Sequence, residues 1–336
     1  MDTPRINIKR RQLLLGAASG LAGAALPLGS ALAQSDYPNR PITFLCPWPA
    51  GGTADVTMRA LAKVLSDHLG QPVVFENRAG ASGMIGARAL AVAKPDGYTI
   101  GQIPISVTRF AQLGTVTFDP LKDFTYLART SGQTFGIVVR ADSPYKTLAE
   151  LVAAAKANPG KLTFASASAG VAGATHVGME EFLLAAGAKM NHIPYKGGAP
   201  ALTDLMGGQV DALADSSSWA PYVEQGKLRL LATWGEQRPP RFAKAPTLKE
   251  AGYNLVVDAP NGIGAPAGLE PQVAEKLRSA LKKAILSPEF KQACDRIDAP
   301  VMYQDAEEYR KYVLSQYVHE KRLIEKLNLK EQIKNG

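Results

Sequence analysis

Two loops of small residues have the composition and the position of a binding site in this chain of 336 residues. The first spans residues 48–55 and the second spans 166–176, and each follows a short apolar run and opens an amphipathic stretch. The first backbone N–H groups of a helix have no partner within the helix and carry the positive end of its dipole, so they bind anions. Glycine and alanine let a ligand approach that backbone closely. The two loops therefore predict a carboxylate site that needs no dedicated arginine.

The candidate ligand-binding residues are the small and polar members of the two loops: Trp48, Ala50, Gly51, Gly52, Thr53, Asp55, Ser166, Ser168, Ala169, Gly170, Gly173, Ala174, Thr175 and His176. Several of them have a simpler interpretation. Thr53 and Asp55 could serve only to cap the first helix, and the two serines and Thr175 could serve only in turns and caps. Trp48 could pack in a core instead of forming a wall of the cleft.

Metal, cofactor and enzyme sites have weak support in the sequence. The four histidines show no i, i+4 pair and the two cysteines form no cluster, so we expect no metal and no cofactor and interpret His176 as a local hydrogen-bonding residue. The glycines of 80–86 are spaced G-x-x-G-x-x-G, unlike a dinucleotide fingerprint, and Ser166 and Ser168 lack the G-x-S-x-G elbow of hydrolases. We expect no enzyme. The alternative is an exported enzyme or a nucleotide-binding protein that uses the same cleft.

Short apolar runs alternate with amphipathic stretches along the chain, which is typical of βα units in a mostly parallel sheet. One block opens with a strand at 42–46 and a helix at 55–69, and a similar block runs from residue 137 to an expected strand at 255–257. Because ligand loops gather at the carboxyl ends of parallel strands, we expect two α/β lobes with a hinge and a ligand cleft between them. The expected limits are 36–136 plus 258–336 for lobe 1, which is discontinuous, and 137–257 for lobe 2.

The N-terminus has the composition of an export signal. Basic residues at 9–11 precede an apolar stretch at 13–28, and small residues at 31–33 fit a cleavage site. We therefore expect residues 1–33 to be a signal peptide. Its arginine pair resembles a twin-arginine signal, while the ordinary secretory route stays open. No cysteine follows the cleavage site, so we expect a soluble protein of the periplasm without a lipid anchor.

The composition argues against a nucleic-acid ligand. The formal net charge is +8, but the Lys and Arg residues are spread along the chain without a basic block, so we expect no nucleic-acid binding. Cys46 and Cys294 are too few for a disulfide framework. They could form one bridge, but two buried thiols are the favoured interpretation.

Five segments resemble a single family, in the family's order: 37–42 (YPNRPI), 47–55 (PWPAGGTAD), 76–81 (ENRAGA), 94–99 (KPDGYT) and 194–201 (PYKGGAPA). They are similar to the substrate-binding proteins of tripartite tricarboxylate transporters, the Bug family. The resemblance implies a type II periplasmic-binding-protein fold, whose two lobes close on a ligand. It also implies that backbone amides and bridging waters from two loops hold the ligand's carboxylate, and these are the two loops selected above from helix chemistry.

The resemblance implies further contacts and a partner. Tyr195, Gly197 and Asp215 would approach the cleft from the second lobe. We expect a monomer that captures a di- or tricarboxylate, or a related organic acid, for the membrane permease subunits of the transporter. A ligand sensor for a signalling partner is the other role open to such a protein.

The chain departs from the family's pattern at three positions. Trp48 stands where relatives often have Phe. Arg109 closes a segment that commonly ends in His, so it could contact a second carboxylate of the ligand, although a surface arginine is the favoured interpretation. Ala172 interrupts a loop that is often Gly-x-Gly-Ser, which puts the side-chain hydrogen bonds of that loop in doubt.

Overall fold

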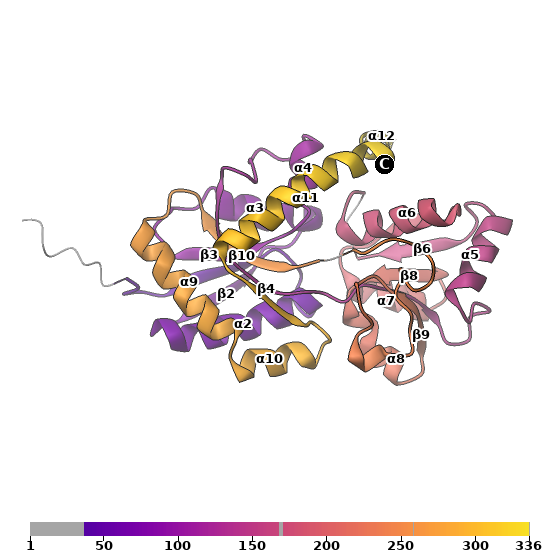
Figure 1. Ribbon diagram of the computed structural model, residues 1–336, viewed down its shortest axis with the longest axis horizontal. Coiled ribbons are helices and arrows are strands. Elements are labelled where there is room, and N and C mark those ends of the chain that lie inside the picture. Colours follow the sequence, from indigo (N-terminus) through magenta and orange to yellow (C-terminus); the bar gives the residue numbers. More distant parts are fainter. Residues whose placement is uncertain (1–36, 168–170, 258, 336) are drawn as a thin grey trace, which may run out of the picture. The chain divides into compact units, whose positions relative to one another are not determined.

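The computed structural model describes residues 37–167, 171–257 and 259–335. The described residues from Pro38 onward form one compact unit that contains two β-sheets (Figure 1). The expected signal peptide at 1–33 lies outside the described residues. Among the described residues, no helix combines the length and the hydropathy that crossing a membrane requires.

The first sheet has six strands: β1 (Ile42–Cys46), β2 (Val73–Asn77), β3 (Thr99–Ile103), β4 (Phe124–Ser131), β10 (Asn261–Pro266) and β11 (Val301–Gln304). Their order across the sheet is β11-β4-β10-β3-β1-β2. β1 lies parallel to both β2 and β3, whereas β10 runs antiparallel between β3 and β4.

The second sheet has five strands: β5 (Gly136–Arg140), β6 (Thr163–Ser166), β7 (Asn191–Pro194), β8 (Ala212–Asp215) and β9 (Leu228–Thr233). Their order is β7-β6-β8-β5-β9, with β6 parallel to β7 and β8 and β5 antiparallel to β8 and β9. In both sheets three parallel strands are followed by one antiparallel strand and then by a fourth strand parallel to the first three, and the first sheet adds β11 antiparallel to β4 at its edge. The antiparallel strand inside each sheet is the one that follows a crossing of the chain, β5 after β4 and β10 after the second sheet. The lobe limits and the hinge stay predictions.

Helices cover both sheets, and they are α2 (Thr53–Leu69), α3 (Met84–Ala91), α4 (Val107–Gln112), α5 (Leu148–Ala157), α6 (Ala174–Ala186), α7 (Gly198–Met206), α8 (Ala220–Glu224), α9 (Pro271–Ile285), α10 (Pro288–Asp295), α11 (Ala306–Lys326) and α12 (Leu329–Asn335). α2 packs against α9 and α10, and α11 packs against α4 and β4. In the second half of the fold, α6 and α7 both contact β8. The long C-terminal helix α11 is drawn in yellow in Figure 1.

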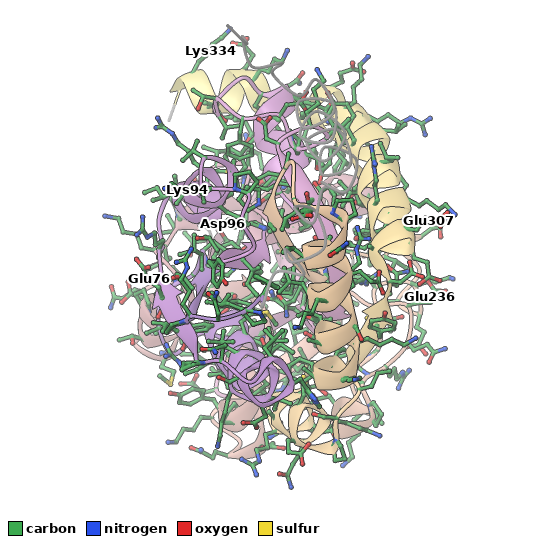
Figure 2. All side chains as sticks on the ribbon, turned by 90° about the vertical axis from the view of Figure 1, so that its left-hand side faces the viewer. Glu76, Lys94, Asp96, Glu236, Glu307 and Lys334 are labelled. Carbon is green, nitrogen blue, oxygen red and sulfur yellow. The ribbon has the colours of Figure 1, made fainter. Side chains whose placement is uncertain are left out.

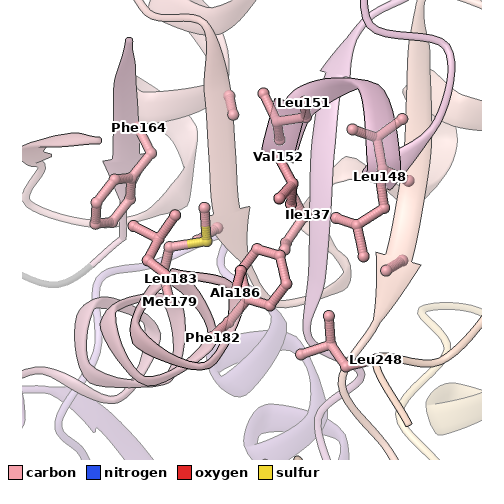
Figure 3. Packing of buried hydrophobic residues seen from close by; sticks show 14 of the residues in the cluster. Ile137, Leu148, Leu151, Val152, Phe164, Met179, Phe182, Leu183, Ala186 and Leu248 are labelled. Carbon is pink, nitrogen blue, oxygen red and sulfur yellow. The ribbon is translucent and has the colours of Figure 1, made fainter. Parts of the chain in front are cut away.

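Each sheet has a buried apolar core. In the second sheet, Phe164 from β6, Met179 and Phe182 from α6 and Leu151 from α5 belong to one buried apolar cluster (Figure 3). Burying one such side chain contributes roughly 1.5–3 kcal/mol, so these helices are held to the sheet mainly by their apolar faces. Charged side chains such as Lys94, Glu236, Glu307 and Lys334 project from the surface (Figure 2).

The expected strand at 255–257 is not a strand. Only the N–H of Val257 reaches the end of β9, by donating to the carbonyl of Trp234, and the antiparallel strand follows as β10. The sequence did not predict β10, because Gly262 and Gly264 lack the β-branched or aromatic side chains that are typical of a strand. A Cβ at these two positions would collide with Tyr309 and Ile103, respectively. A second difference is that α2 begins at Thr53, two residues before the expected start.

We predict that neither cysteine reacts with maleimide in the folded protein. Cys46 and Cys294 are free and fully buried, and burial raises the pKa of each thiol to about 12, so almost no thiolate forms. Mass spectrometry should find both thiols unmodified in native buffer and both labelled in concentrated urea. Labelling of either one in native buffer would contradict their burial.

Candidate ligand-binding site

A cavity of about 450 Å³ is lined by residues that follow strands of both sheets. Its lining includes the loop after β1 (48–54), the end of β3 and the next turn (102, 104–106), the two crossings (133, 135, 259, 260), the start of α6 (174, 175), the first turn of α7 (197–200) and the loop after β8 (215–218). The hydroxyl of Ser216 donates to Thr53 Oγ1 at 3.2 Å and so joins the two sides. The cavity therefore lies where ligand loops of parallel sheets gather.

Three helices begin at this cavity. The N-cap residues of α2, α6 and α7 are Gly52, Gly173 and Gly197, and none of these ends has a side-chain cap. The first-turn residues of all three helices line the cavity. Since the first N–H groups of a helix have no partner within it, three sets of donors and three positive dipole ends meet in one place. The sequence predicted the first two of these helix ends, from α2 and α6.

The first loop is held in shape by the carboxylate of Asp55. Its Oδ2 accepts from the N–H of Gly51 at 3.0 Å, and its Oδ1 accepts from Asn77 Nδ2 and Arg59 Nη2, each at 2.8 Å. Burial opposes ionisation, but the hydrogen bonds from Asn77, Gly51 and Arg59 together hold the pKa of Asp55 below its ordinary value. Asp55 therefore holds the loop from the side away from the cavity. Because the N–H of Gly51 donates to Asp55, it is not free to bind a ligand.

Trp48 forms part of the cavity wall. It is half-buried, and its carbonyl accepts from Asn77 Nδ2 at 2.9 Å. Its indole Nε1–H is buried without a hydrogen-bond partner among the described residues. Trp48 therefore lines the cavity instead of packing in a core.

The second loop is held at Ala172, a non-glycine residue with a φ of +72°. Its N–H donates to His176 Nδ1 at 3.1 Å and its carbonyl accepts from Arg109 Nη1 at 2.9 Å. Arg109 also donates to both carboxylate oxygens of Glu320 on α11, each at 2.6 Å. Both charged side chains are buried. The interpretation of Arg109 as a surface residue is wrong, and the guanidinium is committed to holding this loop, which leaves no part for it in a second ligand carboxylate.

Two histidines support the second loop from behind. The rings of His176 and His192 stack with their centroids 4.1 Å apart, and His192 Nε2 lies 2.8 Å from Ser166 Oγ. Burial, reinforced by His192 and Arg109, lowers the pKa of His176 to about 3, so its ring is neutral and its Nδ1 can accept. The expected role of His176 as a local hydrogen-bonding residue is confirmed. Among the described residues, no cluster of His, Cys, Asp and Glu could hold a metal ion.

Asp215 brings a buried carboxylate to the cavity. The side chain is 2% exposed, and its oxygens accept from Ser218 Oγ at 2.5 Å, from Ser216 Oγ at 3.5 Å and from the N–H of Ser216. No described cation forms an ion pair with it. Burial raises the pKa of Asp215 to about 6. The cavity therefore combines three electropositive helix ends with one acid of its own.

Comparison with known proteins decides the family. Residues 57–329 match the family described as "Tripartite tricarboxylate transporter family receptor". The chain belongs to this family. It is 43% identical to the "UPF0065 protein in gbd 5'region" of Cupriavidus necator over 325 residues, which cover 96% of this chain and 99% of that protein.

Two solved structures extend the comparison to the fold of this family receptor. The periplasmic binding protein BugD has a TM-score of 0.80 at 30% identity, and R. palustris Rpa4515 with adipate has a TM-score of 0.81 at 27% identity. Each match covers 87% of this chain and 99% of the other. The predicted family and the predicted type II periplasmic-binding-protein fold are confirmed.

The candidate residues of the receptor divide into two groups. Those that line the cavity are Trp48, Ala50, Gly51, Gly52, Thr53, Ala174, Thr175, Gly197 and Asp215. Those outside its lining are Asp55, Ser166, Gly173, His176 and Tyr195, whose hydroxyl donates to Asp204 Oδ2 at 2.6 Å. Ser168, Ala169 and Gly170 lie outside the described residues.

The sequence missed a polar junction at the crossings of this receptor. Gln102 and Gln133 line the cavity, and both donate through Nε2 to Asn261 Oδ1, at 2.7 and 2.9 Å. The N–H of Gln133 also donates to the carbonyl of Ala259, which ties one crossing to the other. The three amide residues come from distant parts of the chain, so no local pattern could reveal them.

We predict that the pair between Arg109 and Glu320 is required for stability. Glu320→Leu leaves a buried guanidinium without its counter-charge, so the free energy of unfolding should fall by about 3–5 kcal/mol in urea titrations. Arg109→Met in the same chain removes that charge and should recover much of the loss. Glu307→Gln breaks the exposed pair with Lys311 and should change stability by less than about 1 kcal/mol. Equal losses of unfolding free energy for Glu320→Leu and Glu307→Gln would show that the buried pair is not required for stability.

We predict that Asp215 makes the receptor less stable as pH rises. Its folded pKa of about 6 lies above the ordinary value, so its contribution is fully present below the ordinary pKa of 3.8 and is lost as pH rises through about 6. Asp215→Asn removes this dependence. Relative to the unsubstituted protein, its free energy of unfolding should rise by about 2 kcal/mol between about pH 4 and pH 8. A difference that does not change with pH, measured by urea titration without ligand, would show that the folded pKa is ordinary.

Proposed function

We propose that the protein is a solute receptor of the periplasm that captures a small organic carboxylate and delivers it to the membrane permease of a tripartite tricarboxylate transporter. The observation that carries the proposal is the meeting of uncapped helix N-termini at one cavity. A carboxylate is the anion that such donors bind without a positively charged side chain. The family supports the transport role, and the structural relative described with adipate supports the ligand class.

The two predicted loops supply the carboxylate contacts in this proposal. N–H groups at 52–54 of α2 and of Ala174 at the start of α6 bind the ligand's carboxylate oxygens, directly or through water, and Trp48 forms the wall beside them. The two halves close on the ligand, which excludes water and strengthens the charge-assisted hydrogen bonds. The proposed location in the periplasm is supported by the composition of residues 1–33.

We predict that the ligand-free protein gains thermal stability in a panel of di-, tri- and monocarboxylates, aromatic acids and amino acids. A ligand at about a hundred times its Kd stabilises the folded state by about 2.7 kcal/mol. Nucleotides and neutral sugars serve as controls. Stabilisation by nucleotides alone, or chemical turnover of a bound acid, would contradict the proposal.

The loops can be tested by removing single donors. Ala174→Pro deletes one N–H at the first position of α6, where proline fits, because Gly173 before it has the extended conformation that proline requires. Thr53→Pro does the same at α2. Each change should weaken carboxylate binding about tenfold or more in calorimetry. Ala306→Pro is the matched control at the start of α11, away from the cavity lining. If both cavity variants bind as tightly as the control, the two loops do not hold the ligand.

A further inference from the structure

Asp215 is the one acidic side chain in the lining of the cavity, as far as the described residues show. Its hydrogen-bond donors are the hydroxyls of Ser216 and Ser218 and one backbone N–H, and no described cation pairs with it. A carboxylate that is buried with hydroxyl and backbone N–H partners but no cation retains much of its negative charge uncompensated. A ligand that enters the cavity therefore meets an anion on this side.

The start of α7 is built to receive this carboxylate. Gly197 and Gly198 open the helix, and a Cβ on Gly198 would collide with Asp215 Oδ2. The positive end of α7 thus faces an acid of the protein and offsets only part of its charge. The ends of α2 and α6 have no such acid in the cavity lining, because Asp55 faces the loop from behind and pairs with Arg59. The three helix ends are therefore unequal, and two of them are left for the ligand's own carboxylate.

The other charged residues of the lining do not neutralise Asp215. Lys196 and Arg296 belong to the lining, but both are exposed, and Arg296 Nη2 donates to Gln292 Oε1 at 3.1 Å. No described charged side chain of the lining therefore serves as its counter-charge, and that place is left for a ligand.

The start of α2, where the ligand's carboxylate is proposed to bind, lies close to Asp215. Ser216 follows Asp215 in sequence, and its Oγ lies 3.2 Å from Thr53 Oγ1 at the first position of α2 and 3.5 Å from Asp215 Oδ1, so its single proton serves one of them at a time. A ligand carboxylate at the start of α2 therefore lies close to Asp215. A donor that reaches Asp215 must be attached near that carboxylate.

Resting on the function proposed above, we propose that Asp215 selects carboxylates that carry an ammonium or hydroxyl group next to the carboxylate, that is, α-amino or α-hydroxy acids. The carboxylate binds at α2 and α6 and the neighbouring donor binds to Asp215. An acid that lacks the donor leaves the buried anion unmatched, and a second carboxylate on this side is repelled by it. A ligand with the donor supplies a hydrogen bond to Asp215, whereas a ligand without it leaves this buried group unpaired. The difference in binding free energy between the two ligands is the selectivity.

The test uses matched acids that differ only in the donor. Succinate, malate and aspartate form one set, and phenylacetate, mandelate and phenylglycine form another. Calorimetry near pH 8, where Asp215 is ionised, should show a donor-bearing acid binding at least about tenfold more tightly than its parent in one of the sets. If the amino acid binds more tightly than the hydroxy acid, the donor that Asp215 recognises is an ammonium group. If the hydroxy acid binds more tightly, the donor is a hydroxyl group.

Asp215→Asn should reduce that preference to within about threefold while the parent acid binds as well as before or better. Asp142→Asn, which changes an exposed carboxylate, should keep the full preference. Absence of a donor preference in both sets, including a failure of every member to bind, overturns the assignment. If another carboxylate of the wider panel still binds in that case, the proposed function is supported although the role of Asp215 is wrong.

Discussion

The buried side-chain amide of Asn261 fixes the junction on which both halves of the binding site depend. Its Oδ1 accepts from Gln102 and Gln133, its Nδ2 donates to Ser131 Oγ at 3.0 Å, and its carbonyl accepts from Thr130 Oγ1 at 2.9 Å. Buried polar groups are costly to leave unpaired, so β3, β4 and β10 must keep the register in which all these bonds form. Because Gln102 and Gln133 also line the cavity, a change in that register would alter the site directly.

Around this junction, the site obtains its electropositive character from backbone groups. A charge-assisted hydrogen bond contributes roughly 1.5–3 kcal/mol, whereas a helix dipole contributes about 0.3–1 kcal/mol, so the placement of individual N–H groups decides how an anion is held. That placement rests on side chains behind the loops. Asp55 holds the N–H of Gly51, and Arg109 holds the carbonyl of Ala172 in a conformation that alanine rarely adopts. Charged residues thus shape the loops, and the backbone faces the cavity.

The parts of the structure that the sequence predicted correctly are those with local patterns. The first two helix ends and the strand at Ile42–Cys46 follow from glycine position and apolar periodicity. β10 could not be predicted in this way, because its glycines are explained only by Tyr309 and Ile103, which lie far away in sequence. Arg109 was misjudged for the same reason, since its partner Glu320 lies 211 residues further along the chain. A polar residue's environment is decided by tertiary contacts that periodicity does not contain.

The order of strands in each sheet also decides when, during synthesis, that sheet has all of its strands. All five strands of the second sheet come from one continuous stretch, from Gly136 to Thr233. The first sheet is different, because β10 lies in its middle, between β3 and β4, and is synthesised after the whole second sheet. Until residue 266 has been made, β3 and β4 face each other across a missing strand, and contacts that distant in sequence form late. The half that begins the chain therefore cannot complete its sheet until the second sheet has been made.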